Sequence, residues 1–368
     1  MAERAEIYTV VMAGGRGERF WPQSRQNCPK QLLRLLGNLT LIEQTAARML
    51  SISAPEKCLV ITNKDYVEPM RSLLPMLPAE NIIGEPVGRD TGSCLALATG
   101  ILESRGVSDN AVVIATPADH SIENILALSR TLMQCAEEAL QCDAPVLVGI
   151  KPEYASTGYG YIRCGKVLDS GDGSVRFYAA DGFREKPSNA EVETMLESKV
   201  WRWNSGIFIW RHGVFKPELS KHAPELERIA RQVGRIGGNS AKLADFLNDV
   251  FPSAPNISID YALMEKLDYL VVAECDFPWA DIGSWTALRS QIRADENNNV
   301  VRGSFVGLDT ENCIIVGDSQ HLIAAIDVKD MIIVNQGDVT MVYSEKSAQR
   351  VKELVQKLDK DPGMSKYL

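Results

Sequence analysis

Short apolar runs alternate with longer amphipathic segments along the first 150 residues of the chain. The runs are almost continuous in Val, Ile, Leu and Ala, which is typical of strands that are buried on both faces. Such strands are predicted at residues 7–13, 58–62, 82–83, 111–115 and 146–150. Helices are predicted from the 3.6-residue spacing at residues 40–50, 95–103 and 123–141. This alternation favours an α/β fold, a Rossmann-like domain with a mostly parallel mixed sheet and helices on both faces.

The pattern changes after Lys151. Further strands of a mixed sheet are predicted at residues 158–165, 175–178 and 203–210, and helices at residues 191–198, 224–250, 257–267 and 286–294. Polar residues 295–299 predict a linker, and from residue 300 brief Val and Ile runs separated by Gly, Asn and Asp predict a small β domain of stacked coils. An amphipathic helix follows at residues 346–358. We therefore expect two domains, residues 1–294 and residues 295–368.

Composition narrows the classes of function. The chain has 368 residues, 45% of them hydrophobic and 24% charged, as in an ordinary soluble globular protein. A net charge of −9 disfavours binding to nucleic acid or to a membrane surface. No apolar run reaches the roughly 20 residues of a membrane span, and the N-terminus has no signal-peptide pattern. The eight cysteines form no CxxC pair, so reduced thiols in a cytoplasmic protein are expected.

Residues 10–31, VVMAGGRGERFWPQSRQNCPKQ, concentrate the candidate chemistry. A buried strand ends there in a glycine turn, where backbone N–H groups can approach a phosphate closely. The residues of the turn are Ala13, Gly14, Gly15 and Gly17, and the cations around it are Arg16, Arg19, Arg25 and Lys30. A strand end, a glycine turn and several cations together predict a site for a nucleoside triphosphate.

Two other phosphate-binding motifs do not match the sequence. A dinucleotide fingerprint requires glycine at position 20, where the chain has Phe20. Residues 160–166 match the spacing of a Walker A loop, but Val167 follows instead of a Ser or Thr that could bind magnesium.

The remaining pattern, a strand followed by GGRGERFWP and then PK, resembles the signature of the sugar-1-phosphate nucleotidyltransferases. Six more segments resemble motifs of that family and occur in its order: EPVGRDT, TPADH, GYGYI, FREKP, WNSGIFIW and WADIGSW. The combination is most similar to the guanylyl/mannose branch. The resemblance implies a Rossmann-like nucleotidyltransferase domain followed by a small left-handed β-helix. It also implies GTP and mannose 1-phosphate as substrates and Mg²⁺ as cofactor. We expect a cytoplasmic homodimer without nucleic-acid or membrane partners.

The reaction of such an enzyme can be reasoned from its chemistry. A phosphate oxygen of the sugar 1-phosphate attacks the α-phosphorus of the nucleotide, and pyrophosphate leaves. The nucleophile is already ionised at neutral pH, so catalysis consists of positioning and charge neutralisation. Arg19 and Lys30 suit the leaving pyrophosphate. By resemblance, Asp119 and Asp281 bind Mg²⁺, which prefers oxygen ligands, and Lys186 binds the sugar phosphate.

The remaining candidates select the sugar and the base. The resemblance assigns Gly160, Glu185 and Asn204 to the sugar. Glu85, with Arg89 and Thr91, belongs to the nucleotide loop. A carboxylate at Glu85 can accept both donors of guanine's Watson–Crick edge, or it can instead cap the helix that begins near Asp90.

The chain departs from the family in this loop, which usually reads Arg-Asn-Thr-Ala-Pro. Here it reads Arg89-Asp90-Thr91-Gly92-Ser93. The departure leaves the choice of base open. Three alternatives therefore stay open. The enzyme could use another nucleoside triphosphate, or another sugar 1-phosphate such as that of glucose or manno-heptose, or the protein could be a regulatory subunit without activity.

Two side-chain groups near these motifs are predicted to be structural. His120 is expected to orient the neighbouring Asp119. The tryptophans Trp201, Trp203 and Trp210 have strand-like spacing, which favours core and strand-face positions over stacking on a sugar.

Overall fold

A computed structural model describes residues 6–168, 175–275, 277–318 and 320–368. Residues 1–5, which belong to the N-terminus predicted to lack a signal peptide, lie outside the described part. The chain forms two compact units. The first unit comprises Met1–Gly14, Thr45–Ala118 and Ile122–Trp279, and the second comprises Gly15–Gln44, Asp119–Ser121 and Ala280–Leu368. The predicted boundary between residues 294 and 295 stays a prediction.

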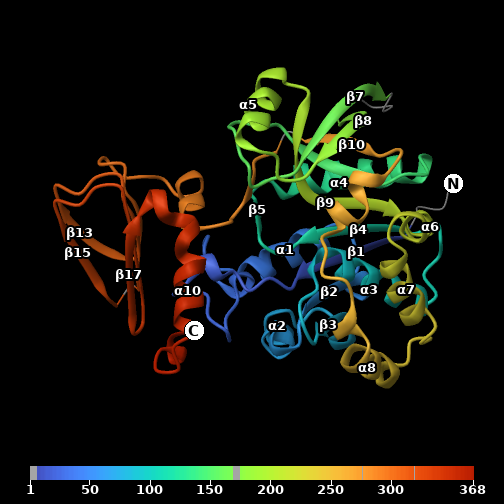
Figure 1. Cartoon of the computed structure of the whole chain (residues 1–368), viewed down its shortest axis with the longest axis horizontal. Coiled ribbons are helices and arrows are strands. Elements are labelled where there is room, and N and C mark those ends of the chain that lie inside the picture. The colour runs from blue at the N-terminus through green and yellow to red at the C-terminus, as the bar shows by residue number, and fades with distance from the viewer. Residues whose placement is uncertain (1–5, 169–174, 276, 319) are drawn as a thin grey trace. The chain divides into compact units, whose positions relative to one another are not determined.

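The first unit is built on one mixed sheet (Figure 1). Within the described residues its strands run in the order β3-β2-β1-β4-β9-β6-β10-β8-β7. Their bounds are β1 Ile7–Ala13, β2 Cys58–Asn63, β3 Ile82–Glu85, β4 Val112–Pro117, β6 Val146–Ile150, β7 Tyr161–Leu168, β8 Arg176–Arg184, β9 Trp201–Arg211 and β10 Val271–Cys275. Strands β3, β2, β1 and β4 pair in parallel, as do β6 and β10. The pairs of β9 with β4 and β6, and of β8 with β7 and β10, are antiparallel. The predicted α/β fold with a mixed sheet is confirmed.

Helices cover this sheet. Their bounds are α1 Leu41–Leu50, α2 Val67–Leu73, α3 Asp90–Ser104, α4 Ile125–Gln141, α5 Asn189–Ser198, α6 His212–His222, α7 Pro224–Gly234, α8 Ser240–Asp249 and α9 Ile259–Ala262. Helices such as α4 and α7 cover the sheet with one apolar side, whereas α3 is buried on all sides from Gly92 to Leu102. Helices α3 and α7 pack against each other over one face of the sheet, and α4 contacts β4, β6, β9 and β10. Among the described residues, no helix is both long and apolar enough to cross a lipid bilayer.

Several predicted helices are wrong in extent. The single helix predicted at residues 224–250 is two helices, α7 and α8, because Gly237 and Gly238 between them have positive φ angles of 66° and 73°. The helix predicted at residues 257–267 is the short α9 followed by a 3-10 turn at Met264–Lys266. Strand β10 was missed, because its apolar run is short and follows directly after a segment predicted as a helix, residues 257–267.

The β-rich tail has the stacked coils that the sequence predicts. Its elements are β12 Val300–Arg302, β13 Ser304–Leu308, β14 Ile314–Val316, β15 Leu322–Ile326, β16 Met331–Gln336, β17 Val339–Ser344 and α10 Val351–Asp359. Strand β14 pairs in parallel with β12 and β16, and β13 pairs in parallel with β15. The helix predicted at residues 346–358 begins as a 3-10 turn, Glu345–Arg350, and becomes α-helical only at Val351.

The glycine-rich loop belongs to the same unit as this tail. Phe20 is fully buried and meets Trp285 edge to face, with 5.1 Å between the ring centroids. The indole N–H of Trp285 donates to the backbone oxygen of Trp21 at 3.3 Å, and Trp21 in turn donates to the backbone oxygen of Tyr367 at 2.8 Å. One apolar core therefore joins residues 20–41 to residues 282–351 of the tail.

Candidate active site

Lys30 is held against the glycine turn. Gly17 has a φ of +68°, and a Cβ built there would lie 2.2 Å from the Cβ of Lys30. Only glycine suits this position, because the conformation is unfavourable for other residues and Lys30 occupies the space. Gly15 is exposed in the same turn, and Arg19 is exposed on the 3-10 turn Glu18–Phe20 that follows.

Lys30 lies between two carboxylates. Lys30 is only 5% exposed to solvent. Its Nζ lies 2.8 Å from Oδ2 of Asp119 and 3.6 Å from Oδ1 of Asp281. The ammonium group also lies 5.5 Å from the centroid of the Phe20 ring. These groups are far apart in the sequence, and the fold of the second unit brings them together.

Asp119, His120 and Asp281 form a possible metal site. Each offers one ligand atom, and these atoms lie within 4.8 Å of one another. Burial acts to raise the pKa of Asp119, but the charge and hydrogen bond of Lys30 outweigh it, and the pKa is lowered. Both carboxylates are half-buried, so they can hold a hard divalent cation and leave part of its coordination shell for phosphate oxygens and water. Two carboxylates are a fitting donor set for such a cation.

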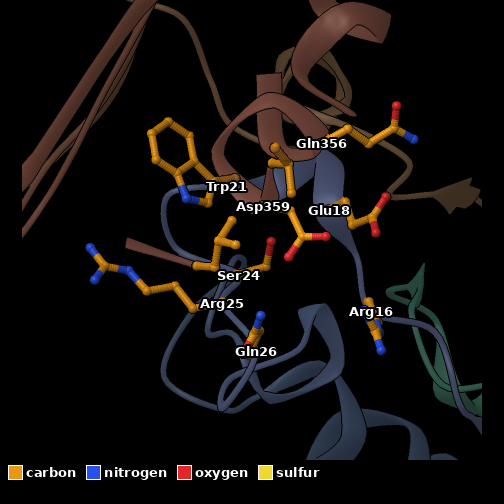
Figure 2. Close-up of a pocket in the computed structure, with 10 residues that line it drawn as sticks. Arg16, Glu18, Trp21, Ser24, Arg25, Gln26, Gln356 and Asp359 are labelled. Atoms are coloured by element: carbon orange, nitrogen blue, oxygen red, sulfur yellow. The ribbon is translucent and has the colours of Figure 1, made fainter. Parts of the chain in front are cut away.

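The loop that leads to this cluster also borders a pocket within the second unit. Figure 2 shows Trp21, Ser24 and Arg25 of the loop lining the pocket together with Gln356 and Asp359 of α10. Arg25 is held by Asp338 at 2.6 Å, and the hydroxyl of Ser24 donates to the backbone oxygen of Gly17 at 2.6 Å. Helix α10 thus borders the loop that carries the cations.

Glu85 lies at the end of β3 in the first unit and has an unusual environment. Glu85 is only 3% exposed to solvent, and none of the described groups forms a hydrogen bond with its Oε1. Burial raises the pKa of its carboxyl group to about 8. A Cβ built on Gly14 would lie 3.2 Å from Oε2 of Glu85, so the carboxyl group lies beside the glycine turn. The preceding Ala13 is buried and accepts a hydrogen bond from the hydroxyl of Thr62 at 3.0 Å.

Glu85 does not cap helix α3. The residue at the N-cap of α3 is Arg89, whose side chain makes no capping hydrogen bond. The alternative that Glu85 acts as a helix cap is therefore wrong, and its carboxyl group keeps a free oxygen for a ligand.

Arg89 and Thr91 have protein partners in the structure. One N–H of the Arg89 guanidinium group donates to the backbone oxygen of Pro252, and the hydroxyl of Thr91 accepts from the backbone N–H of Ile259 at 2.9 Å. Helix α3 begins at Asp90, five residues before the predicted start at Leu95, so Thr91 lies in its first turn.

The predicted sugar residues come together in the first unit. A Cβ built on Gly160 would lie 2.4 Å from Oε2 of Glu185 and 3.4 Å from the Cβ of Asn204. The backbone N–H of Asn204 donates to the oxygen of Gly160 at 2.8 Å. The ammonium group of Lys186 is 3.2 Å from Oε1 of Glu185, and its side chain is 59% exposed, so it can reach an incoming phosphate. Burial raises the pKa of Glu185, although Lys186 opposes the shift.

Asp260 belongs to this group and was missed from the sequence. Its Oδ1 accepts a hydrogen bond from the side-chain amide of Asn204 at 2.7 Å. Burial, followed by the charge of Glu185, raises the pKa of Asp260 to about 7. The contact joins residues 56 positions apart, and no motif in the sequence singles out this aspartate.

The prediction of core and strand-face positions for the tryptophans is confirmed, since all three lie on β9. Trp203 is 4% exposed and Trp210 is 1% exposed, and Trp210 stacks on Phe215 with 4.4 Å between centroids. Trp203 meets Tyr154 edge to face at 4.8 Å. Trp201 is only half-buried at the start of β9.

The predicted site residues thus form two sets. Lys30, Asp119 and Asp281 meet in the second unit, which also contains Gly15, Gly17 and Arg19. The first unit holds the nucleotide residues Ala13, Gly14, Glu85, Arg89 and Thr91 and the sugar residues Gly160, Glu185, Lys186 and Asn204. The chain passes from one unit to the other between Gly14 and Gly15.

Comparison with known proteins identifies the family of both regions of the chain. The model of the family described as Nucleotidyl transferase matches residues 8–298, and the model of the MannoseP isomerase/GMP-like beta-helix domain matches residues 303–358. A mannose-1-phosphate guanylyltransferase of Escherichia coli is 33% identical over 360 residues, which cover 96% of this chain and 76% of the relative. One from Klebsiella pneumoniae is 35% identical over 354 residues, covering 95% of this chain and 73% of the relative.

A solved structure extends the likeness to the whole fold. The crystal structure of a protein from Thermus thermophilus, described as a mannose-1-phosphate geranyltransferase, is 32% identical to this chain. It matches with a TM-score of 0.83 over 96% of this chain and 99% of its own.

Proposed function

This chain belongs to the nucleotidyl transferase family, and we propose that it transfers a guanylyl group from GTP to α-D-mannose 1-phosphate, giving GDP-mannose and pyrophosphate. The family acts on a sugar 1-phosphate and a nucleoside triphosphate. The choice of mannose and guanine is supported by the names of the relatives, which match over nearly the full length of this chain.

One structural observation supports the chemistry above the others. A buried lysine, Lys30, lies within ion-pair distance of two aspartates, Asp119 and Asp281. We assign Lys30 and Arg19 to the pyrophosphate, where they would neutralise the charge of the leaving group. We assign Asp119 and Asp281 to a Mg²⁺ ion, which would polarise the α-phosphate when bound.

The transfer itself needs no general base. An ionised phosphate oxygen of mannose 1-phosphate forms a bond to the α-phosphorus of GTP, and the bond from that phosphorus to the bridging oxygen of pyrophosphate breaks. Lys186 would bind and orient the attacking phosphate, because its ammonium group is exposed beside Glu185. Glu185, Asn204 and the backbone of Gly160 would bind the sugar hydroxyls.

We assign the base to Glu85. Guanine presents N1–H and the 2-amino group on one edge, and the two oxygens of the Glu85 carboxylate can accept from both once the group has lost the proton that burial favours. The carboxyl group of Glu85 is buried beside Gly14, with one oxygen that forms no hydrogen bond with any described group. The backbone of Ala13, Gly14, Gly15 and Gly17 would cradle the phosphates.

A substrate panel tests the proposal. Purified protein is given Mg²⁺, each of the four nucleoside triphosphates and several sugar 1-phosphates in turn, and pyrophosphate release is measured. We expect release with GTP and mannose 1-phosphate. Release only with glucose 1-phosphate, a manno-heptose 1-phosphate or another nucleotide would replace the proposed substrates. The absence of release with every pair would favour a regulatory subunit.

We also propose a cytoplasmic homodimer. Among the described residues no cysteine forms a disulfide, which supports a reducing compartment. The outward face of the β13–β15 pair is apolar and open, with Val306, Leu308, Leu322 and Ile326 between 50% and 69% exposed. Soluble monomers rarely leave such a contiguous face uncovered.

Sedimentation tests the dimer. We expect the protein to sediment as a dimer, and Ile326→Lys to give a monomer. The control is Leu126→Lys on α4, where an exposed leucine lies outside this face. A wild-type protein that sediments as a monomer would end the homodimer proposal.

A further inference from the structure

The start of helix α3 is tied to the segment 255–259, which leads into α9. The hydroxyl of Thr91 accepts from the backbone N–H of Ile259 at 2.9 Å. The hydroxyl of Ser93, which is fully buried, donates to the backbone oxygen of Pro255 at 2.6 Å. The hydroxyls of Thr91 and Ser93 are therefore both hydrogen-bonded to the backbone of a segment distant in the sequence.

Gly92 brings the two backbones into contact. Its N–H donates to the oxygen of Ile257 at 3.0 Å, and a Cβ built on Gly92 would lie only 2.6 Å from that oxygen. Alanine at this position would push the backbones apart. Gly92 and Ser93 are also two of the positions at which the loop departs from the family pattern, so the departure coincides with this attachment.

The other end of the same segment reaches the sugar residues. Asp260, the second residue of α9, accepts from the side-chain amide of Asn204 at 2.7 Å, and the amide oxygen of Asn204 accepts from the backbone N–H of Gly206 at 3.0 Å. These two bonds use one donor and the acceptor of the amide, and they fix which way it faces.

A second carboxylate in this part of the chain, Glu265, contacts Glu185. The backbone N–H of Glu185 donates to Oε1 of Glu265 at 2.8 Å. Residues 255–265 therefore contact the nucleotide loop at one end, and they contact Asn204 and Glu185 at the other.

We propose that Asp260 is a positioning residue for the sugar, and that Thr91 holds Asp260 in place by anchoring the start of α9. Thr91 then serves sugar recognition, although it lies in the loop that sequence reasoning assigns to the nucleotide. This inference rests on the proposed function, because the sugar half-site is identified through it. The loop and the sugar residues are thus joined within the first unit by the hydrogen bond at Ile259, the peptide link from Ile259 to Asp260, and the hydrogen bond between Asp260 and Asn204.

Steady-state kinetics separate the two roles of Thr91. Thr91→Val keeps the shape of the side chain and removes the acceptor for the N–H of Ile259. We expect it to raise the KM for mannose 1-phosphate roughly 5- to 10-fold, with the KM for GTP changed less than about 2-fold, as the loss of one positioning hydrogen bond predicts. Thr91→Ser restores the hydroxyl and should restore the KM. The control is Thr99→Val, since the only described partner of the Thr99 hydroxyl is the backbone oxygen of Leu95 within α3.

The Asp260 variants complete the comparison. Asp260→Ala should raise the KM for the sugar phosphate at least as much as Thr91→Val, and Asp260→Asn, which keeps an acceptor oxygen, should recover most of the loss. A rise confined to the KM for GTP in Thr91→Val, or an unchanged sugar KM in Asp260→Ala, would overturn the inference.

Hydrogen exchange tests the same link without any substrate. Thr91→Val should speed the exchange of the Ile259 amide and, through Asp260 and Asn204, the exchange of the Gly206 amide. If the Gly206 amide exchanges at the wild-type rate, the link is refuted even in an active enzyme. If the wild-type protein releases no pyrophosphate but Thr91→Val still speeds the exchange of the Gly206 amide, the proposed function fails, while the structural coupling of Thr91 to Asn204 is upheld.

Discussion

Glu85→Gln isolates the effect of one buried carboxyl group on stability. Glu85 is 3% exposed, and none of the described groups forms a hydrogen bond with its Oε1. Burial raises the pKa of its carboxyl group from 4.5 to about 8. Glutamine has nearly the same shape and cannot ionise, so the substitution removes the cost of a buried charge while keeping the packing.

The direction of the pH effect follows from this raised pKa. Between pH 4.5 and pH 8 the folded protein holds a proton on Glu85 that the unfolded chain has lost. The stability contributed by this group therefore falls as the pH rises through that window. With about 1.4 kcal/mol for each pH unit, the wild type should lose about 2–4 kcal/mol between pH 5 and pH 8 relative to Glu85→Gln.

Urea denaturation at pH 5, 6, 7 and 8 measures this difference. The wild type and Glu85→Gln should have similar free energies of unfolding at pH 5, and the variant should become progressively more stable as the pH rises. Glu197→Gln, at an exposed position of α5, provides the matched control and should follow the wild type at every pH. Parallel curves for wild type and Glu85→Gln would show that Glu85 is not a buried, unpaired carboxyl group, and its assignment to the base would lose its support.

Four further substitutions test individual side chains. Lys30→Ala should lower pyrophosphate release at least about 100-fold with little change in Tm, and a smaller loss would remove Lys30 from catalysis. Asp281→Asn should raise the Mg²⁺ concentration for half-maximal activity roughly 10-fold or more, whereas an unchanged titration would contradict its assignment to the metal. Lys186→Ala should raise the KM for mannose 1-phosphate roughly 10- to 100-fold and spare the KM for GTP; the reverse pattern would reassign it. Trp210→Ala should cost about 3–5 kcal/mol of unfolding free energy in urea titrations, because this buried ring stacks on Phe215, and a cost below about 1 kcal/mol would contradict that packing.

The sequence predicted best those elements that local pattern alone determines. Strands β1 and β6 were found at or within one residue of their bounds, because a strand buried on both faces must be apolar throughout. The break between α7 and α8 was missed although Gly237 and Gly238 mark it, since the apolar spacing on either side of the glycines continues as if in one helix.

The parts that depend on distant residues could not be read from the sequence. The apolar core that Phe20 shares with Trp285 groups the glycine loop with the β-rich tail, and no local pattern reports a contact across so many residues. Asp260 was missed for the same reason, because its burial and its hydrogen bond from Asn204 both arise from contacts with residues distant in the sequence. Motifs located Lys30 and Asp281, but only the structure brought them within 3.6 Å.

The two units carry different parts of the proposed site. Lys30, Asp119 and Asp281 belong to the unit that contains the β-helix, whereas Glu85 and the residues proposed for the sugar belong to the unit that contains the large sheet. Asp119 is the first residue after one passage of the chain between the units, and Asp281 is the second residue after another. The lysine and both aspartates are thus carried by the unit whose core contains Phe20 and Trp285. We therefore expect the packing of the β-helix to support the position of the charged groups, so that the tail contributes to the proposed catalysis although none of its described strands carries a proposed site residue.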